Sequence, residues 1–349
     1  MEVSPIHLAS TGKFQLNLNQ KSKMIEIVTC NKGTIFFVSI VACKGMIKRA
    51  LLKYFTSLRR KFVNTQKFVV KKDKKIKLSE YPTTDNTKYT EKELKETLIP
   101  ESLKKLKDLH MKLHAQEEKG VIVVLQAMDA AGKDEAITYI FSHLTAQGLK
   151  TTSFQKPSET ELAHDYLWRF REGLPARGQL GIFNRSYYEE VIAPRVHDLL
   201  GETPLPDELI DEDIWQVRYR QINDFERYMT ENGFPVVKFF FNMSYDEQRR
   251  RLLERMKDPK KNWEFSFNDV KEREYWGGYQ EIFEDVLNHT STTDAPWYAL
   301  PADDEWYSRY IVSEVMVEAL EKIDPQYPEM EGQEKEKLEK AIRQLEEEE

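Results

Sequence analysis

The residues best suited to chemistry form a short loop between an apolar run and a helical pattern. Residues 121–125 are apolar and mostly β-branched, as in a strand buried on both faces, and the apolar residues of 137–144 recur at helical spacing. Between these segments, residues 127–133 end in Gly132 and Lys133. A strand-to-helix loop of this kind turns backbone N–H groups toward an anion, and its lysine adds a mobile charge. The loop therefore predicts phosphate binding.

The loop departs from the pattern G-x-x-x-x-G-K-[ST] at two positions. Ala127 replaces the first glycine, and Asp134 replaces the hydroxyl residue that binds Mg²⁺. An ordinary strand–turn–helix with a surface lysine would also fit these residues. Asp129 inside the loop favours a phosphate site, because a carboxylate among phosphate-binding amides needs a metal ion or a placed acceptor to offset its charge.

A second strand-to-helix junction carries Asn184, Arg185 and Ser186 where the predicted strand at 181–183 ends. Further strands are expected at 150–155, 236–241 and 297–300. Strands that alternate with helices predict an α/β fold with a doubly wound parallel sheet, whose ligands bind at the carboxyl ends of the strands. The helices are expected at 90–120, broken at Pro100; after the cap Ser158; at 211–232; at 244–290, broken at Asp258–Pro259; at 304–323; and in the tail from residue 329.

Charge divides the chain into unlike parts. Residues 1–78 hold 17 Lys and Arg against 3 Asp and Glu, a net charge of +14, whereas residues 79–349 hold 35 against 56, a net of −21. We expect a basic N-terminal extension over 1–78, partly helical or poorly ordered, and an acidic tail over 326–349. Residues 46–62 would form an amphipathic basic helix, which suits a packed accessory helix, contact with an anionic surface or polymer, or an organellar targeting helix.

Composition limits the remaining possibilities. No apolar run approaches the roughly 20 residues that span a bilayer, so no stable membrane span is expected. Both cysteines, Cys30 and Cys43, lie in the extension, so no disulfide framework supports the rest, and a cytoplasmic location is expected. His110 and His114 are four residues apart, but no third ligand type clusters near them, which favours ordinary helix positions.

Phosphoryl transfer fits this set of residues. The reaction needs positioning and charge neutralisation more than covalent help from the protein. Residues 249–261 are rich in Arg and Lys, although such a run also suits a solvated helix face. No histidine base or Ser-His-Asp order stands out. That absence suits a phosphate acceptor, since it is ionised at neutral pH and needs no base.

Several motifs resemble those of the family-2 polyphosphate kinases, most closely the subgroup that acts on both AMP and ADP. The resemblance covers roughly residues 85–325. The segments that carry it are 126–134, 183–189, 195–197, 258–263, 266–273, 290–297 and 301–304.

The resemblance implies a P-loop kinase-like, thymidylate-kinase-like fold, with three α/β/α layers over residues 79–325 and a helical lid at about 249–268. It implies reversible, Mg²⁺-dependent transfer of the terminal phosphoryl group of inorganic polyphosphate to a nucleotide. This transfer would convert AMP to ADP and ADP to ATP. It also implies a homo-oligomer, either a dimer or a tetramer. No nucleic-acid partner is expected.

Carried onto this sequence, the resemblance assigns Asp129 to the Mg²⁺ ion and the acceptor phosphate, and Lys133 to neutralising the transferring group. Arg185 would belong to the second phosphate motif, and Arg251 and Arg255 would be lid residues that close on the phosphates. An Arg fork suits this role because it binds phosphate oxygens bidentately and keeps its charge. The remaining candidate phosphate- or nucleotide-binding residues are Met128, Ala130, Ala131, Gly132, Asp134, Lys156, Arg169, Arg171, Asn184, Glu189 and Arg195.

Three departures from the family pattern lie close to these residues. Glu135 stands where relatives usually have Gly, Glu264 where Lys is common, and Gly277–Gly278 replace a more polar pair. Each could weaken polyphosphate binding or lid closure. Two other functions stay open: an ATP-dependent nucleotide or nucleoside kinase, and a non-catalytic polyphosphate- or nucleotide-binding regulator.

Overall fold

The computed structural model describes residues 26–28, 37–39, 63–72, 75–86, 88–203 and 205–348. The chain divides into two units, Met1–Val63 and Asn64–Glu349. In the first unit, β1 (Glu26–Val28) pairs with β2 (Phe37–Ser39) in antiparallel orientation. The helix expected at 46–62 and both cysteines lie outside the described residues.

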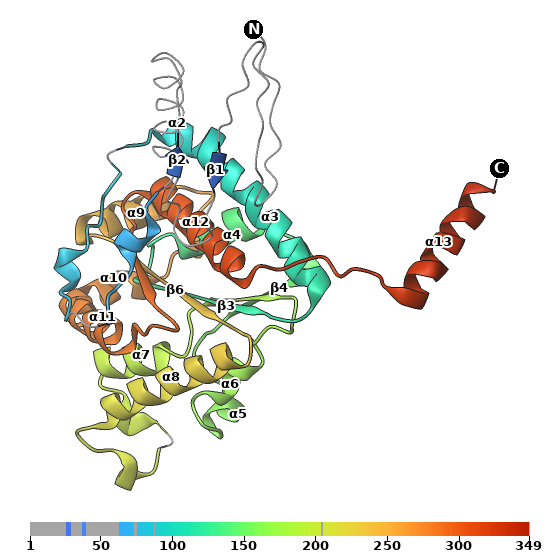
Figure 1. The fold of residues 1–349 in the computed structure, drawn as a ribbon. Helices are drawn as coiled ribbons and strands as arrows, with labels where there is room; N and C mark the ends of the chain where they lie inside the picture. The colour runs from blue at the N-terminus through green and yellow to red at the C-terminus, as the bar shows by residue number, and fades with distance from the viewer. Residues whose placement is uncertain are drawn as a thin grey trace. The chain divides into compact units, whose positions relative to one another are not determined.

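A five-stranded parallel sheet forms the centre of the second unit (Figure 1). Its order is β4-β5-β3-β6-β7, so the chain leaves β3 for one side of the sheet and later returns to the other. The end of β3 is therefore the switch point, where sheets of this kind bind ligands. This sheet confirms the expected α/β, P-loop kinase-like architecture. The strands are β3 (Val121–Ala127), β4 (Leu149–Ser153), β5 (Leu180–Asn184), β6 (Val236–Asn242) and β7 (Trp297–Pro301).

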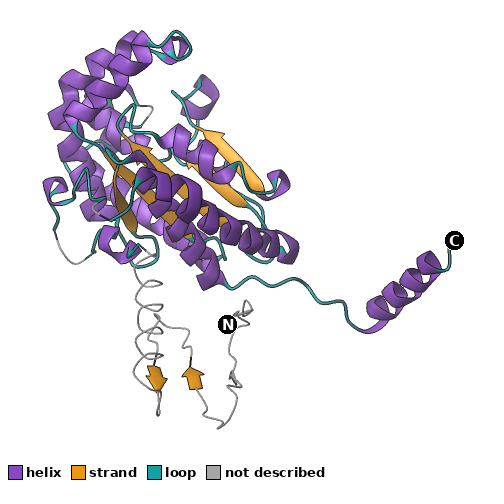
Figure 2. Cartoon of the chain, turned by 90° about the horizontal axis from the view of Figure 1, so that it is seen from above, coloured by secondary structure: helices purple, strands orange, loops and turns teal. Residues whose placement is uncertain are grey.

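Helices cover both faces of the sheet and complete three layers (Figures 1 and 2). The central strands are buried along most of their length because neither face meets water, which explains their apolar composition. One face carries α3 (Ile99–Gln116), α4 (Lys133–Phe141) and α12 (Glu305–Ile323); the other carries α7 (Glu189–Val196), α8 (Ile214–Glu231) and α11 (Trp276–Thr290).

The helix expected at 90–120 is not broken by its proline. Thr90 caps α2 (Glu91–Glu93), a π-helical turn follows at Leu94–Leu98, and α3 continues from Ile99. Pro100 occupies the first turn of α3. A proline is tolerated there because it lacks only an N–H, and the wider π turn before it takes up the altered hydrogen bonding. The expectation of two separate pieces was wrong for this reason.

The helix expected after Ser158 is two short helices instead of one. Ser158 caps α5 (Glu159–Leu162) through a capping box with Glu161, as expected. The chain then turns, and Asp165 accepts a hydrogen bond from the backbone N–H of Leu167 at 3.0 Å. That side-chain acceptor competes with helical hydrogen bonding, so α6 (Trp168–Arg171) starts anew.

The charged segment at 244–290 breaks where the sequence predicted. Ser244 caps α9 (Tyr245–Lys257), which ends at Asp258 because the residue before a proline favours extended backbone. Residues 258–272 follow, and we call them the lid segment, after the lid that the resemblance implies at about 249–268 and that stays a prediction. It contains a 3₁₀ turn at Asn262–Glu264 and α10 (Phe267–Glu272), and a second 3₁₀ turn at Arg273–Tyr275 leads into α11.

Residues 64–78, which the charge pattern grouped with the extension, pack into the second unit. The backbone N–H of Val70 donates to the Trp297 carbonyl at 2.8 Å. Phe68, Val70, Ile76 and Leu78 are each at most 3% exposed. At the other end, every residue of α13 (Gly332–Glu346) is exposed, as expected for a solvated acidic tail. In the described part of the chain, no helix is both long and apolar enough to cross a membrane.

Candidate active site

The loop between β3 and α4 has the backbone of an anion-binding turn. Gly132 has a φ of 89° and Ala130 a φ of 63°, in the left-handed region. Helix α4 begins at Lys133, and its first turn closes with the Ala136 N–H donating to Gly132 O at 3.0 Å. The positive end of α4 therefore faces the loop, as the sequence predicted.

A second phosphate motif meets this loop at the carboxyl edge of the sheet. The register pairs Leu125 of β3 with Asn184 of β5, so both strands end side by side. Arg185, with a φ of 62°, donates to the Asp129 carboxylate at 3.1 Å. Arg185 is nevertheless about half exposed, so part of its side chain is accessible to a ligand.

Two further polar bridges join the same pair of strand-to-helix units. The amide of Asn184 donates to Asp134 at the start of α4. Behind the loop, Gln126 donates to Glu189 at 3.0 Å, and Gln126 is 1% exposed. These contacts fix the spacing between Lys133 at the start of α4 and Arg185 after β5.

Lys133 is a buried cation, with only 6% of its surface exposed. Burial lowers the pKa of its ammonium group, and the nearby charge of Asp129 opposes that shift. An anionic ligand would stabilise the charged form further. The geometry therefore suits a lysine whose ammonium group is shielded from water and would be stabilised in its charged form by a bound phosphate.

Arg251 of α9 lies behind the loop and supports it. Its guanidinium donates to Glu247 at 2.7 Å, to Ala302 O at 2.6 Å and to Ala130 O at 3.3 Å, and the residue is 8% exposed. These partners occupy the fork that was expected to close on phosphates. Arg255, one turn later, is 23% exposed and 3.9 Å from Asp269, so it is the more available of the two.

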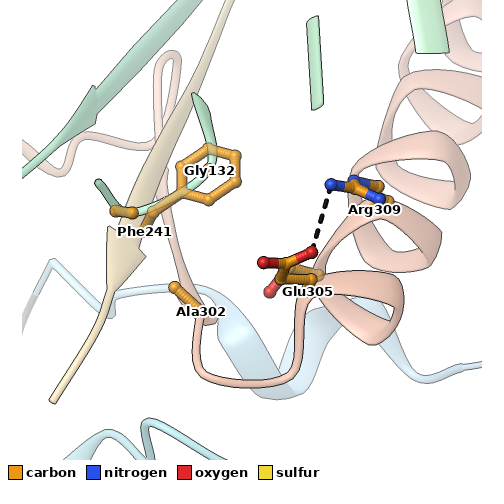
Figure 3. Close-up of a pocket in the computed structure, with 7 residues that line it drawn as sticks. Gly132, Phe241, Ala302, Glu305 and Arg309 are labelled. Atoms are coloured by element: carbon orange, nitrogen blue, oxygen red, sulfur yellow. Dashed lines mark hydrogen bonds and ion pairs between the residues drawn. The ribbon is translucent and has the colours of Figure 1, made fainter. Parts of the chain in front are cut away.

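Figure 3 shows a small pocket on this rear side of the loop. Gly132 and Phe241 face Glu305 and Arg309 of α12 across it. Arg309 donates to Glu305 at 3.3 Å, and Arg251 lies 3.6 Å from the same carboxylate. The charged side chains around this pocket are already paired with one another. They support the loop from behind, and the pocket is not a substrate cavity.

The remaining predicted cations do not form one open track. Arg169 is buried and donates to Gln155 O at 2.6 Å and to Glu190 at 2.8 Å. Arg195 is bound to the Tyr219 hydroxyl at 2.5 Å and to Asp285 at 2.9 Å, at the junction of α7, α8 and α11. Lys156 and Arg171 are exposed. Lys156 and Arg169 line a cavity of about 430 Å³ beyond the end of β4.

Polar residues that the sequence analysis did not assign also surround the loop. Asp269 and Tyr279 both have pKa values raised first by burial, and the charge of Asp129 contributes to each shift. Tyr279 donates to Glu272 at 2.7 Å, and Glu272 lies 3.2 Å from His197. Segment 266–273 was part of the resemblance, but its polar residues have the same spacing as a solvated helix, so no role could be assigned.

Beneath Arg185, a buried ion pair anchors the residues that follow it. Lys238 donates to Glu226 at 2.6 Å, and both residues are at most 1% exposed. Tyr187 and Tyr188 donate to the same Glu226 carboxylate at 2.8 and 2.9 Å. Every one of these groups has a partner, as a buried charge requires. The network ties the backbone after Arg185 to α8 and β6.

No cluster of three or more His, Cys, Asp or Glu side chains able to hold a metal ion occurs among the described residues. Mg²⁺ in phosphoryl-transfer sites, however, commonly uses one or two carboxylates together with phosphate oxygens and water. Asp129, about one-third exposed beside Lys133 and Arg185, fits that donor set.

Comparison with known proteins identifies the family. Residues 88–328 match the family described as Polyphosphate kinase 2 (PPK2). The chain belongs to the polyphosphate kinase 2 family. This membership confirms the expectation of a polyphosphate-dependent phosphotransferase.

Individual relatives and structures agree with this family. An ADP-polyphosphate phosphotransferase of Rhodopseudomonas palustris is 44% identical over 269 residues, which are 76% of this chain and 93% of the relative. An AMP/ADP-polyphosphate phosphotransferase of Meiothermus ruber is 44% identical over 66% of this chain and 81% of the relative. The crystal structure of polyphosphate kinase 2 from Arthrobacter aurescens TC1 superposes with a TM-score of 0.70 at 33% identity, covering 77% of this chain and 93% of that one.

Proposed function

We propose that this polyphosphate kinase 2 transfers the terminal phosphoryl group of polyphosphate to both AMP and ADP, reversibly. The observation that carries the proposal is the convergence of Lys133, Asp129 and Arg185 at the carboxyl edge of β3 and β5. Support for the acceptors comes from the two relatives, whose names specify ADP in one case and AMP and ADP in the other.

The chemistry assigned to these residues is charge neutralisation and alignment. Lys133 and Arg185 would hold oxygens of the transferring phosphoryl group, while the loop amides hold the neighbouring phosphates. Arg255, on the last turn of α9 just before the lid segment, would approach the phosphates as that segment closes, because its contact with Asp269 is long enough, at 3.9 Å, to be replaced by a contact with phosphate. An acceptor phosphate is already ionised, so no side chain needs to remove a proton.

We further propose that Mg²⁺ is bound by Asp129, directly or through water, together with phosphate oxygens. The ion would neutralise charge on the phosphates. Asp129→Asn should lower activity and raise the Mg²⁺ concentration needed for half-maximal rate, because an amide is a weaker ligand. Titration of Mg²⁺ with the wild type and the variant measures this. Unchanged Mg²⁺ dependence with full activity would remove Asp129 from the metal site.

The deciding experiment offers the protein polyphosphate, Mg²⁺ and either AMP or ADP, with no ATP present. Formation of ADP from AMP and of ATP from ADP is expected. A parallel reaction with ATP as the only donor tests the ordinary kinase. Tight binding of polyphosphate without any product would instead favour the non-catalytic regulator.

A homo-oligomeric state and a cytoplasmic location remain predictions from the sequence. Light scattering of the purified protein tests the first, and a dimer or tetramer is expected. Fractionation of the source cells tests the second.

A further inference from the structure

Gln248 of α9 is buried, with 2% of its surface exposed, and both ends of its amide are engaged. Its Nε2 donates to the backbone carbonyl of Asp129 at 3.0 Å, and its Oε1 accepts from Arg273 at 2.7 Å. These two partners fix the orientation of the amide, because the reversed amide would oppose donor to donor and acceptor to acceptor. A single side chain thus connects the phosphate-binding loop with the residue that follows α10.

Arg273 is itself held on the first turn of α9. Its guanidinium donates to Tyr245 O at 3.2 Å and lies 3.9 Å from the centre of the Tyr245 ring. Tyr245 begins α9, which precedes the lid segment at 258–272, and Arg273 immediately follows that segment. The helix before the lid segment, α9, and the residue after it, Arg273, are therefore joined at Gln248.

The contact to Asp129 determines the direction of a loop amide. In a planar trans peptide the C=O and the next N–H point in opposite directions. Because the Asp129 carbonyl points to Gln248, the Ala130 N–H points away from α9. Ala130 has a φ of 63°, which a residue with a Cβ seldom adopts without support from its surroundings. Arg251 holds the next carbonyl, that of Ala130, at 3.3 Å.

We propose that Gln248, with Arg273 behind it, is a positioning residue that couples the lid segment to the phosphate-binding loop. The guanidinium polarises the Gln248 amide and strengthens its hydrogen bond to Asp129 O. A lid segment that moves toward the phosphates would move Arg273, and through Gln248 it would adjust the Asp129–Ala130 peptide. This role rests on the proposed function for its catalytic consequence, but the local geometry can be tested apart from it.

Gln248→Glu is the sharpest single change. It keeps the size of the side chain and the contact to Arg273, but sets a carboxylate oxygen against the Asp129 carbonyl. We expect kcat with polyphosphate to fall about ten- to a hundredfold, since a small misplacement of reacting groups has effects of that size. The KM for nucleotide and the Tm should change little. Gln248→Leu should show a similar loss without added negative charge, and Gln333→Glu, on exposed α13, is the matched control.

The relay is tested by removing its second member. Arg273→Leu should lower kcat, and the double variant Gln248→Leu/Arg273→Leu should be little worse than either single variant, because both interrupt the same connection. Arg273→Lys should recover part of the activity by donating one hydrogen bond. Hydrogen exchange adds a readout independent of turnover: amides of residues 128–132 should exchange faster in Gln248→Glu and Arg273→Leu, while those of β6 stay protected.

The outcomes separate this inference from the function on which it rests. A wild type that cannot use polyphosphate would refute the proposed function, and the hydrogen-exchange comparison would still decide the coupling. Loop exchange and kcat within about twofold of wild type in Gln248→Glu and Arg273→Leu would overturn the inference. Fully additive losses in the double variant would do the same. If Gln248→Leu fails to fold, Gln248→Glu and Arg273→Lys carry the test.

Discussion

At the scale of the residue, Lys133 combines burial with a task that requires its charge. Burial lowers the pKa of its ammonium group, so the charge is lost at a lower pH than in an exposed lysine. Bound phosphate stabilises the charged form and raises that pKa again. The activity of the enzyme should therefore report the protonation of this one side chain on its alkaline side.

Lys133→Ala should reduce kcat by orders of magnitude with little change in Tm, because a desolvated charge contributes little to stability. In the wild type, kcat/KM should decline with rising pH before kcat does, since free enzyme has the lower lysine pKa. Lys133→Arg should move any remaining alkaline decline upward, because a guanidinium keeps its charge. Identical pH profiles for wild type and Lys133→Arg, or full activity in Lys133→Ala, would contradict the assignment.

At the scale of the element, α9 carries two arginines in different environments. Arg251 is buried against three backbone carbonyls and Glu247, whereas Arg255 faces Asp269 at 3.9 Å and is partly exposed. One turn of helix therefore separates a residue that supports the loop from one that is available to substrate.

Arg251→Ala and Arg255→Ala should consequently fail in different ways. The first should lower Tm by several degrees as well as activity, because it leaves the carbonyls of Ala302 and Ala130 without their side-chain donor and removes one of the two arginine partners of Glu247. The second should lower kcat at nearly constant Tm. Calorimetry and steady-state rates on both variants measure this, with Arg249→Ala, exposed on the same helix, as control. An unchanged Tm in Arg251→Ala would place that residue with the substrate instead.

At the scale of the whole molecule, the fold begins earlier than the charge pattern suggested. A chain starting at Asn64 should keep the Tm and activity of the second unit. A chain starting at residue 79 loses Phe68, Val70, Ile76 and Leu78 from the core and should be strongly destabilised. Thermal unfolding of both chains measures the difference. Equal stability would show that residues 64–78 are dispensable.

The charge of the whole domain bears on the donor. Residues 79–349 carry a net charge of −21, so a long polyanion must be held by a few local cations. We expect the KM for long polyphosphate to rise steeply with salt and to fall with chain length, by analogy with counterion release from nucleic acids. ATP, which makes a fixed number of contacts, is the control donor. Flat salt dependence for long chains would argue against binding through several phosphate contacts.

The sequence by itself determined that strands alternate with helices, and it located the two strand-to-helix junctions proposed to bind phosphate. Apolar runs such as 121–125 and the change to helical spacing are local signals, and parallel strands bring their carboxyl ends to one edge regardless of other detail. That rule brings Asp129 and Arg185 to the same edge of the sheet, but their ion pair was not predicted from the sequence. Only the tertiary structure decided how accessible each of the predicted arginines is. The sequence does not distinguish Arg169, Arg195 and Arg251 from Arg185. Arg185 pairs with Asp129 but stays about half exposed, whereas the other three are mostly covered by partners such as Glu190, Asp285 and Ala302. The same holds for Gln248, whose two partners are 119 and 25 residues away. Contacts between distant segments depend on packing, and no local pattern records them.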